Sequence, residues 1–573
     1  MVQSSNTQWA RVPRALTNGA MGSKVLLAGL SLYVVGLCVV PLLLLFAEIG
    51  TTGLPTVAEV MAAPSTRLAA YRTVEASLGA TAVSLVLGGY LALVLGAARP
   101  AGRACLTFLV LVPMLVPAQI AALAWLELTG PSSVILGAIG LAPEPGTRNP
   151  LYSREGIILL MGIEHMPIVF LAVRAGLRSI PNDLLEAGNL AGAGSMRSLW
   201  RIVFPLLRPS FLAGGALAFA AAVGNFGIPA LLGIPGRYTM LTALIYQRLS
   251  GFGPSVLGEV AVLSLLLALI AVIALTAQGF AQARARVVLS GQGMPVQFKV
   301  SQRTRIALTV SVLLLLIPAS VLPVFALMGT SVVKALGLPL TLETMTISHY
   351  ADVLSNSTAR RAFVNSAWLS AASAVLSMLI AVPLAWMMLN RRNRLARVLN
   401  RCADLPYALP GVVISIAFIL AFLRPIPVLG IGLYGTGWLI LLAYLARFLA
   451  LSLRPVTAAF EAMDPALDEA ARIAGAGPVV RMRRILLPSV APAAGAGVLL
   501  VVLSAYNELT VSALLWSRGN ETVGVLVFNL YDEGNATGAA AASVLAVAVT
   551  FAAAALATAI ARWLPKGVLP WQA

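Results

Sequence analysis

The sequence predicts an all-α, polytopic membrane protein with about 12 transmembrane helices, arranged as two parallel six-helix repeats. Apolar residues make up 59% of the 573 residues and charged residues only 10%, and the mean hydropathy is +0.91. Soluble domains have about 45–50% apolar and about 25% charged residues, so this composition indicates a membrane protein. A second observation predicts the two repeats, because one polar motif occurs once in each half of the chain.

Twelve apolar runs reach the roughly 20 residues that a helix needs to cross a bilayer. The first half contains six of them, at about residues 24–46, 74–97, 104–127, 156–175, 210–234 and 256–280. The second half contains six more, at about residues 306–329, 363–389, 404–423, 436–453, 489–515 and 539–561. An even number of spans per half makes the repeat parallel. We therefore expect a pseudo-two-fold axis along the membrane normal, with a pathway between the halves.

The polar motif begins at Glu186 in the first half and at Glu469 in the second, 283 residues later (469 − 186). Every matched pair keeps this offset without a gap. We predict two helical hairpins, at residues 181–205 and 464–488. Small residues share one face of each first helix, glycines end that helix, and a second short helix runs to a proline. The candidate functional residues are Glu186, Ala187, Gly192, Gly194 and Pro205, and in the second copy Glu469, Ala470, Ala471, Gly475, Gly477 and Pro488.

The detail of each hairpin follows from helix-capping rules. In the first copy Gly192 or Gly194, and in the second copy Gly475 or Gly477, can take the left-handed conformation that ends a helix. Ser195 is a candidate N-cap for the second short helix of the first copy, and Pro478 is a candidate first-turn proline in the second copy. Pro205 and Pro488 are expected to end these short helices.

The basic residues predict the orientation. With a cytoplasmic N-terminus, 27 of the 39 Lys and Arg residues fall on the cytoplasmic side, which supports cytoplasmic N- and C-termini. Both hairpins then lie in the cytoplasm. The net charge of +18 is explained by these loops, so no nucleic-acid partner is expected. We predict a first repeat at residues 1–280, a cytoplasmic linker at 281–305 and a second repeat at 306–573.

Enzyme chemistry is not expected. The sequence contains no G-x-x-x-x-G-K-[ST] loop, no H-E-x-x-H, no G-x-S-x-G and no C-x-x-C motif. Cys38, Cys105 and Cys402 have neither metal-ligand spacing nor an obvious disulfide partner. The chain is therefore expected to bind no cofactor or metal, and any ATP that drives it must bind to a separate subunit.

Polar residues inside apolar runs are candidates for a pathway. Asn225, Phe226, Asn507 and Glu508 follow the hairpins, and Glu508 is about 30 Å along a helix from Pro488. The alternatives are a tight packing motif of small residues and a surface pair between Glu508 and Arg518. Glu164 and Arg447 are also 283 residues apart, and we expect that they could pair across the pseudo-axis.

The hairpin motif resembles the EAA motif of binding-protein-dependent ABC transporter permeases, which reads E-A-A, three residues, G, nine residues, I-x-L-P. The second copy matches it with Glu469-Ala470-Ala471, Gly475, Ile485 and Leu487-Pro488, and the first departs at Gly188 and Phe204. The resemblance implies that each hairpin docks on an ATPase. It also implies two ABC ATPase subunits, a periplasmic substrate-binding protein and a place in the bacterial inner membrane. The alternative is a hairpin that only connects two spans.

A narrower resemblance is to fused ferric-iron-type permeases. It rests on Phe226 to Gly233, Leu241 to Tyr246, Glu508-Leu509-Thr510, and Leu530 to Gly534. The resemblance implies import of iron(III), and permeases for thiamine, putrescine or aminoethylphosphonate share much of the pattern. Two other classes remain open: an ion-coupled secondary transporter, which would need no ATPase docking site, and a membrane scaffold, which would not explain two similar halves.

Overall fold

The described part of the chain is almost entirely helical, as the sequence predicts. The computed structural model describes residues 15–98, 100–251, 256–284, 297–298, 300–389, 394–425 and 430–561. No strand forms within these ranges, and an isolated β-bridge joins Val333 to Met345. Most of the predicted linker, including Gly291, Gly293 and Pro295, lies outside the described residues.

The described residues of the first half form fourteen α-helices, and the π-helical turns among them are labelled η. These elements are α1 Ala15–Tyr33, η1 Val34–Val39, α2 Val40–Thr52, α3 Leu54–Ala62, α4 Pro64–Leu93, η2 Val94–Ala98, α5 Arg103–Leu115, α6 Ala118–Thr129, α7 Val134–Ala138, α8 Arg154–Ser179, α9 Asp183–Leu190, α10 Ser195–Ser198, η3 Leu199–Val203, α11 Phe204–Gly224, η4 Pro229–Gly233, α12 Ile234–Gly236, α13 Leu241–Leu249 and α14 Val256–Arg284.

The second half repeats this order with small differences. Its elements are α15 Gln302–Leu316, η5 Ile317–Val321, α16 Leu322–Ser331, α17 Ser348–Ser355, α18 Ser357–Leu389, α19 Arg394–Ala408, α20 Gly411–Phe422, α21 Gly437–Ala462, α22 Pro465–Ile473, α23 Pro478–Arg481, η6 Met482–Leu486, α24 Leu487–Tyr506, α25 Ser512–Leu515, α26 Val523–Asp532 and α27 Ala536–Ala561. The equivalent helices α8 and α21, and α11 and α24, begin 283 residues apart.

The number of spans agrees with the prediction. Among the described residues, 11 helices are long and apolar enough to cross a membrane, or up to 12 if one bent pair counts as a span. The prediction of one continuous span at residues 104–127 and another at 404–423 is wrong in detail. Each stretch forms two helices separated by a break, α5 and α6 in the first half and α19 and α20 in the second. The second break, between α19 and α20, turns the chain by 109°. Pro117 and Pro410 are the residues just before α6 and α20, and each is the N-cap of the helix that follows.

The first span of each half packs against the other half. Helix α2 lies against α20, and η1 lies against α19 and α21. The Tyr33 hydroxyl donates a hydrogen bond to the Leu445 carbonyl at 3.1 Å. Reciprocally, α16 packs on α6, where the Thr330 hydroxyl donates to the Glu127 carboxylate at 2.9 Å. The two halves are therefore interlocked by an exchange of their first spans.

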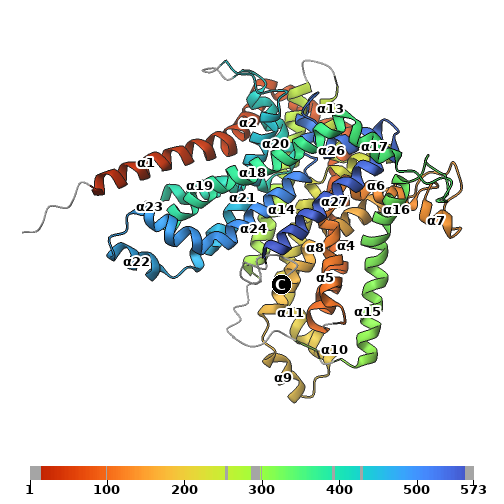
Figure 1. The fold of residues 1–573 in the computed structure, drawn as a ribbon, viewed down its shortest axis with the longest axis horizontal. Helices are drawn as coiled ribbons and strands as arrows, with labels where there is room; N and C mark the ends of the chain where they lie inside the picture. The colour runs from red at the N-terminus through yellow and green to blue at the C-terminus, as the bar shows by residue number, and fades with distance from the viewer. Residues whose placement is uncertain are drawn as a thin grey trace, which may run out of the picture.

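The ends of the helical bundle differ in character. Helices α9 and α10 of one hairpin and α22 and α23 of the other project at one end (Figure 1). Helices α7, α13, α17 and α26 gather toward the opposite end (Figure 1). We call these the hairpin end and the opposite end.

Candidate functional site

The first hairpin ends its leading helix in a Schellman motif. Helix α9 has Ala191 as its C-cap, and Gly192 follows with φ +79°. The Ala193 amide donates to the Gly188 carbonyl at 2.9 Å, and the Gly192 amide donates to Asn189 at 3.0 Å. These two bonds satisfy carbonyls that would otherwise lack a partner at the helix end.

The second hairpin repeats this geometry. Gly475 has φ +78°, close to the value at Gly192. The Ala476 amide donates to the Ala471 carbonyl and the Gly475 amide to the Arg472 carbonyl, both at 3.0 Å. Of the two candidate glycines in each copy, only the first is left-handed. The other two, Gly194 and Gly477, precede the short helices α10 and α23.

The prediction that proline ends each short helix is wrong. The chain stays helical from Ser195 to Gly224 and from Val479 to Tyr506. Pro205 and Pro488 lie in the first turn of α11 and α24, directly after the π-helical turns η3 and η6. Proline cannot donate to the preceding turn, but the π-helical turn before it already interrupts the regular hydrogen-bond ladder, so the helix can continue. Gly194 rather than Ser195 is the N-cap of α10.

Each hairpin exposes apolar side chains at matched positions. Leu190 is 91% exposed and its equivalent, Ile473, is 89% exposed. Met196 and its equivalent Val479 are exposed as well. Exposed apolar side chains that recur at equivalent places on both hairpins are candidates for contact with a partner. The sequence analysis did not single out these side chains, although their repetition at the offset of 283 was available as a signal.

The candidate hairpin residues are accessible, with one exception. Ala187 and Ala470 are exposed, whereas Ala471 is buried on the inner face of α22. Glu186 is exposed and accepts a hydrogen bond from the Asn182 side chain at 2.9 Å. Glu469 lines a hollow of about 670 Å³ between α22 and the cytoplasm-facing ends of α18, α19 and α21 in the predicted orientation.

The second hairpin carries an internal brace. The Arg481 guanidinium on α23 donates to the two carboxylate oxygens of Asp468 on α22, at 2.8 and 3.0 Å. Such a bidentate pair fixes both distance and orientation. It therefore holds the two short helices of this hairpin at a defined angle across the Gly475 turn.

A central junction forms where the broken helices of one half meet the post-hairpin helix of the other. Helices α11 and α24 end at Gly224 and Tyr506, earlier than the predicted spans 210–234 and 489–515. The Asn507 side-chain amide donates to the Leu115 carbonyl at the end of α5, at 3.4 Å. A Cβ built on Gly224 would lie 3.5 Å from the Pro410 Cα, at the break between α19 and α20.

The predicted pathway residues lie in or beside this junction. Asn225 and Glu508 are equivalent by the offset of 283, and each caps the turn that follows it. The Ile228 amide donates to the Asn225 side-chain oxygen at 3.2 Å, and the Val511 amide donates to the Glu508 carboxylate at 2.9 Å. Phe226 is 1% exposed and belongs to the packed interior.

The polar residues at membrane depth pair within each half. The Asn225 side-chain amide donates to Glu164 at 2.6 Å, and the Arg447 guanidinium lies 3.6 Å from the Glu508 carboxylate. The expected pair between Glu164 and Arg447 is therefore wrong. The alternative pair of Glu508 with Arg518 is not the one that forms. A neutral amide with a carboxylate in the first half thus corresponds to an ion pair in the second.

A second repeated signal escaped the sequence analysis. Pro113 and Pro117 in the first half correspond to Pro406 and Pro410 in the second, at an offset of 293. The first half has ten more residues than the second between these prolines and its hairpin motif, so the prolines do not keep the offset of 283. These prolines place the breaks that build the central junction.

Comparison with known proteins places this architecture in a family. Residues 84–287 and 377–569 each match the family model described as the binding-protein-dependent transport system inner membrane component. The "Probable ABC transporter permease protein y4fN" of Sinorhizobium fredii is 28% identical over 484 residues, covering 82% of this chain and 83% of the relative.

Two further relatives are named with substrates. The Fe(3+)-transport system permease protein FbpB 2 of Haemophilus influenzae is 24% identical, covering 78% of this chain and 80% of the relative. PhnU of Salmonella paratyphi A, provisionally named as a 2-aminoethylphosphonate transport system permease protein, is 30% identical, covering 35% of this chain and 69% of the relative. The chain belongs to the family of binding-protein-dependent transport system inner membrane components, carries that family's domain twice, and is an ABC transporter permease.

Proposed function

We propose that this chain is the transmembrane permease subunit of an ATP-driven importer, and that two ATPase subunits dock on its two hairpins. The observation that carries the proposal is the pair of matching hairpins at one end of the bundle. Each is fixed by a Schellman turn and exposes an apolar residue, Leu190 or Ile473, at its tip. A partner that covers both surfaces gains apolar burial at two equivalent places.

The mechanism follows from the continuity of the helices. Each hairpin continues without a break into α11 or α24, which ends in the central junction. When ATP binding draws two ATPase subunits together, the hairpins move with them and the long helices carry this motion to the junction. The pathway between the halves then opens alternately to each side. In this arrangement, the hairpin end faces the cytoplasm and the opposite end faces the binding protein.

The proposed substrate is iron(III). A relative that is similar over four fifths of its length is named as an Fe(3+)-transport permease, and the resemblance in the sequence points the same way. Glu508, Glu164 and Asn225 place oxygen atoms at the central junction, and hard cations prefer oxygen ligands. Aminoethylphosphonate is the competing substrate, because PhnU is similar over a shorter region.

The test is uptake into proteoliposomes. The chain is reconstituted with its cognate ATPase and binding protein, and radiolabelled iron(III), putrescine, thiamine and aminoethylphosphonate are offered in parallel. We expect ATP-dependent accumulation of iron(III) alone. ATP-dependent accumulation of another compound would replace the substrate but keep the importer. Accumulation driven by a proton or sodium gradient without the ATPase would overturn the proposal.

The role of Glu508 in the pathway is tested in the same vesicles. Glu508→Gln removes the charge and keeps the shape of the side chain. We expect uptake to fall, whereas the affinity for the binding protein and basal ATP hydrolysis stay unchanged. Unaltered uptake at limiting substrate would remove Glu508 from the pathway.

A further inference from the structure

A hollow of about 610 Å³ lies between the two halves at the opposite end of the bundle. Its first-half wall is formed by η4, α12 and α13, and its second-half wall by α26 and the start of α27. The polar groups on the wall are Tyr246, Gln247, Ser250, Tyr531 and Asp532. All of these carry oxygen atoms. Among the described lining residues, Asp532 is the one charged residue and none is Lys or Arg, although the Arg148 guanidinium donates to the carbonyl of the lining residue Pro235 at 2.8 Å.

The inner side of this hollow is closed by aromatic rings from both halves. Tyr246 and Phe528 are the sixth residues of the matched helices α13 and α26, at an offset of 282, and their ring centroids lie 5.9 Å apart at an interplanar angle of 84°. Phe226, which is 1% exposed, contacts both rings from the interior, at 5.3 and 6.2 Å. Edge-to-face contacts at these separations are favourable, so the three rings form a packed layer. We call Tyr246 and Phe528 the aromatic seal.

Each ring of the seal is fixed to its own half. The amide of Leu241, the first residue of α13, donates to the Thr73 hydroxyl on α4 at 2.8 Å. The amide of Val523, the first residue of α26, donates to the Ser366 hydroxyl on α18 at 2.9 Å. These equivalent bonds satisfy helix N-termini from a neighbouring span. Consequently α13 moves with α4, and α26 moves with α18.

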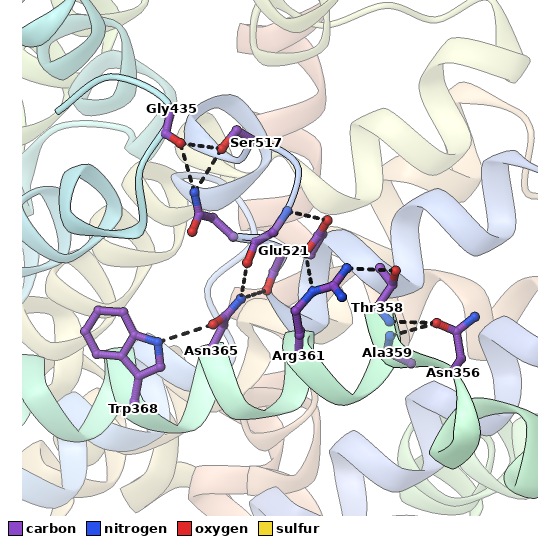
Figure 2. A network of polar contacts seen from close by, with 11 residues as sticks. Asn356, Thr358, Ala359, Arg361, Asn365, Trp368, Gly435, Ser517 and Glu521 are labelled. Carbon is purple, nitrogen blue, oxygen red and sulfur yellow. Dashed lines mark hydrogen bonds and ion pairs between the residues drawn. The ribbon is translucent and has the colours of Figure 1, made fainter. Parts of the chain in front are cut away.

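The attachment of α26 is reinforced by a larger polar network, shown in Figure 2. The Asn365 side chain on α18 donates to the carbonyls of Gly519 and Glu521, at 3.2 and 3.0 Å. The Asn520 side chain donates to the Gly435 carbonyl at 2.9 Å. The loop that leads into α26 is thereby held against α18 and the start of α21.

The attachment of α13 has its own polar support. The Tyr238 hydroxyl donates to the Glu75 carboxylate on α4 at 2.7 Å, and Arg154 lies 3.2 Å from the same carboxylate. Burial and the hydrogen bond to Glu75 raise the pKa of Tyr238, so its hydroxyl keeps its proton and continues to donate. Both seal helices are therefore rigid parts of their halves, and the seal opens only when the halves separate.

We propose that this hollow is the entry vestibule for a cationic substrate and that the aromatic seal is the gate at its base. A described lining with one carboxylate, several oxygen atoms and no basic residue favours cations over anions. The vestibule straddles the two halves, so separating them would open its base directly onto the central junction. The inference rests on the proposed importer function, and the class of substrate it selects includes iron(III) and polyamines.

Cross-linking tests the gate. In a chain whose three cysteines, Cys38, Cys105 and Cys402, are replaced by alanine, cysteines are introduced by Tyr246→Cys and Phe528→Cys. A short bifunctional thiol reagent should abolish uptake, and a reducible version should allow recovery on reduction. The matched control is Trp368→Cys with Trp438→Cys, whose parent rings lie 5.8 Å apart within the second half. Cross-linking this control should leave uptake intact. Uptake that survives cross-linking across the seal would overturn the gate.

The selectivity of the vestibule is tested without a substrate. A single cysteine is introduced by Gln247→Cys in the same cysteine-free background. Its rates of reaction with a cationic and with an anionic methanethiosulfonate reagent are each divided by the rate of that reagent with a small free thiol. We expect the cationic reagent to react at least several-fold faster. Asp532→Asn should remove this preference. Glu533→Gln should keep it, because Glu533 is exposed but does not line the vestibule.

The outcomes separate the two proposals. A preference for the cationic reagent that is lost in Asp532→Asn and kept in Glu533→Gln supports the cation-selective vestibule, whatever compound is transported. Equal rates for both reagents in the parent, or a preference indifferent to Asp532→Asn, overturn it. Failure of the reconstituted parent to accumulate any tested compound counts against the proposed function and leaves the labelling result standing.

Discussion

At the scale of single residues, the hairpins depend on two glycines with φ near +78°. A Cβ built on either Gly192 or Gly475 would meet no atom within 4 Å. Crowding therefore does not explain why glycine occupies these positions. The left-handed conformation does, because it costs other residues about 1–2 kcal/mol.

Gly475→Val is accordingly expected to misplace the second hairpin without preventing membrane insertion. A β-branched residue is especially unfavourable at positive φ. Uptake and substrate-stimulated ATP hydrolysis should both fall, and the purified complex should lose ATPase. Gly192→Val should act similarly, with a milder effect because the first copy departs further from the motif.

The matched control for this change is Gly477→Val. Gly477 lies two residues later, also has open space around its Cβ position, and is not left-handed. It should retain most activity. Equal damage from Gly475→Val and Gly477→Val would show that bulk in the hairpin, rather than backbone conformation, is what matters.

The Arg447–Glu508 pair is the second residue-scale feature, with side chains only 19% and 11% exposed. In its first-half counterpart, the Glu164 carboxylate accepts a hydrogen bond from the neutral Asn225 side chain instead of pairing with a positive charge. Glu508→Asn should lower the thermal stability by leaving Arg447 without its partner, at a cost of up to about 3 kcal/mol. Arg447→Glu should do the same, because it places two carboxylates together.

The double variant, Arg447→Glu with Glu508→Asn, recreates the first-half pair in the second half. We expect its melting temperature in detergent to exceed that of either single variant, which a double-mutant cycle would measure as a favourable coupling. Additive losses in the double variant would mean that the two positions do not form an interchangeable pair.

At the scale of elements, α4 and α8 pack closely enough to bring backbone to backbone. A Cβ on Gly88 would lie 2.5 Å from the Met166 carbonyl oxygen and 3.0 Å from the Phe170 amide nitrogen. The Ser84 hydroxyl donates to the Gly162 carbonyl across the same contact, at 2.8 Å. Small residues with an interhelical hydrogen bond are the usual means of helix association in membranes.

Gly88→Val should therefore destabilise the first half, because backbone atoms cannot yield to the new side chain. Overpacking of this kind costs about 1–3 kcal/mol or more. The expected result is a lower yield of monodisperse protein and a lower melting temperature. Gly36→Val is the control, since a Cβ on Gly36 meets nothing within 4 Å. Normal stability of Gly88→Val would contradict the close packing of α4 and α8.

The elements differ in how far the sequence predicts them. The hairpins follow from local rules, since glycine at a helix end and the repeat at 283 predict a left-handed turn at one glycine of each pair, and the structure places it at Gly192 and Gly475. The breaks at Pro117 and Pro410 escape a hydropathy analysis, because a bent pair of helices is as apolar as a straight one. Pro205 and Pro488 show the converse, since a π-helical turn before each allows the helix to continue.

At the scale of the whole molecule, two interlocked halves enclose the junction and the vestibule. The exchange of first spans, with α2 on α20 and α16 on α6, is a long-range arrangement that no local pattern specifies. The incorrect prediction that Glu164 pairs with Arg447 has the same origin, because no local pattern specifies which residues meet between the halves. Residues equivalent by repeat are related by the pseudo-axis, so they meet only when both lie beside it, as Tyr246 and Phe528 do.

The central claim is that the two hairpins are two docking sites of equal kind, and the subunit ratio of the purified complex tests it most directly. The chain is tagged, coexpressed with its cognate ATPase, and examined by native mass spectrometry together with its uptake activity. We predict two ATPase subunits per chain, and one in a variant carrying Gly475→Val. A fully active complex with one ATPase subunit, or with none, would contradict the account.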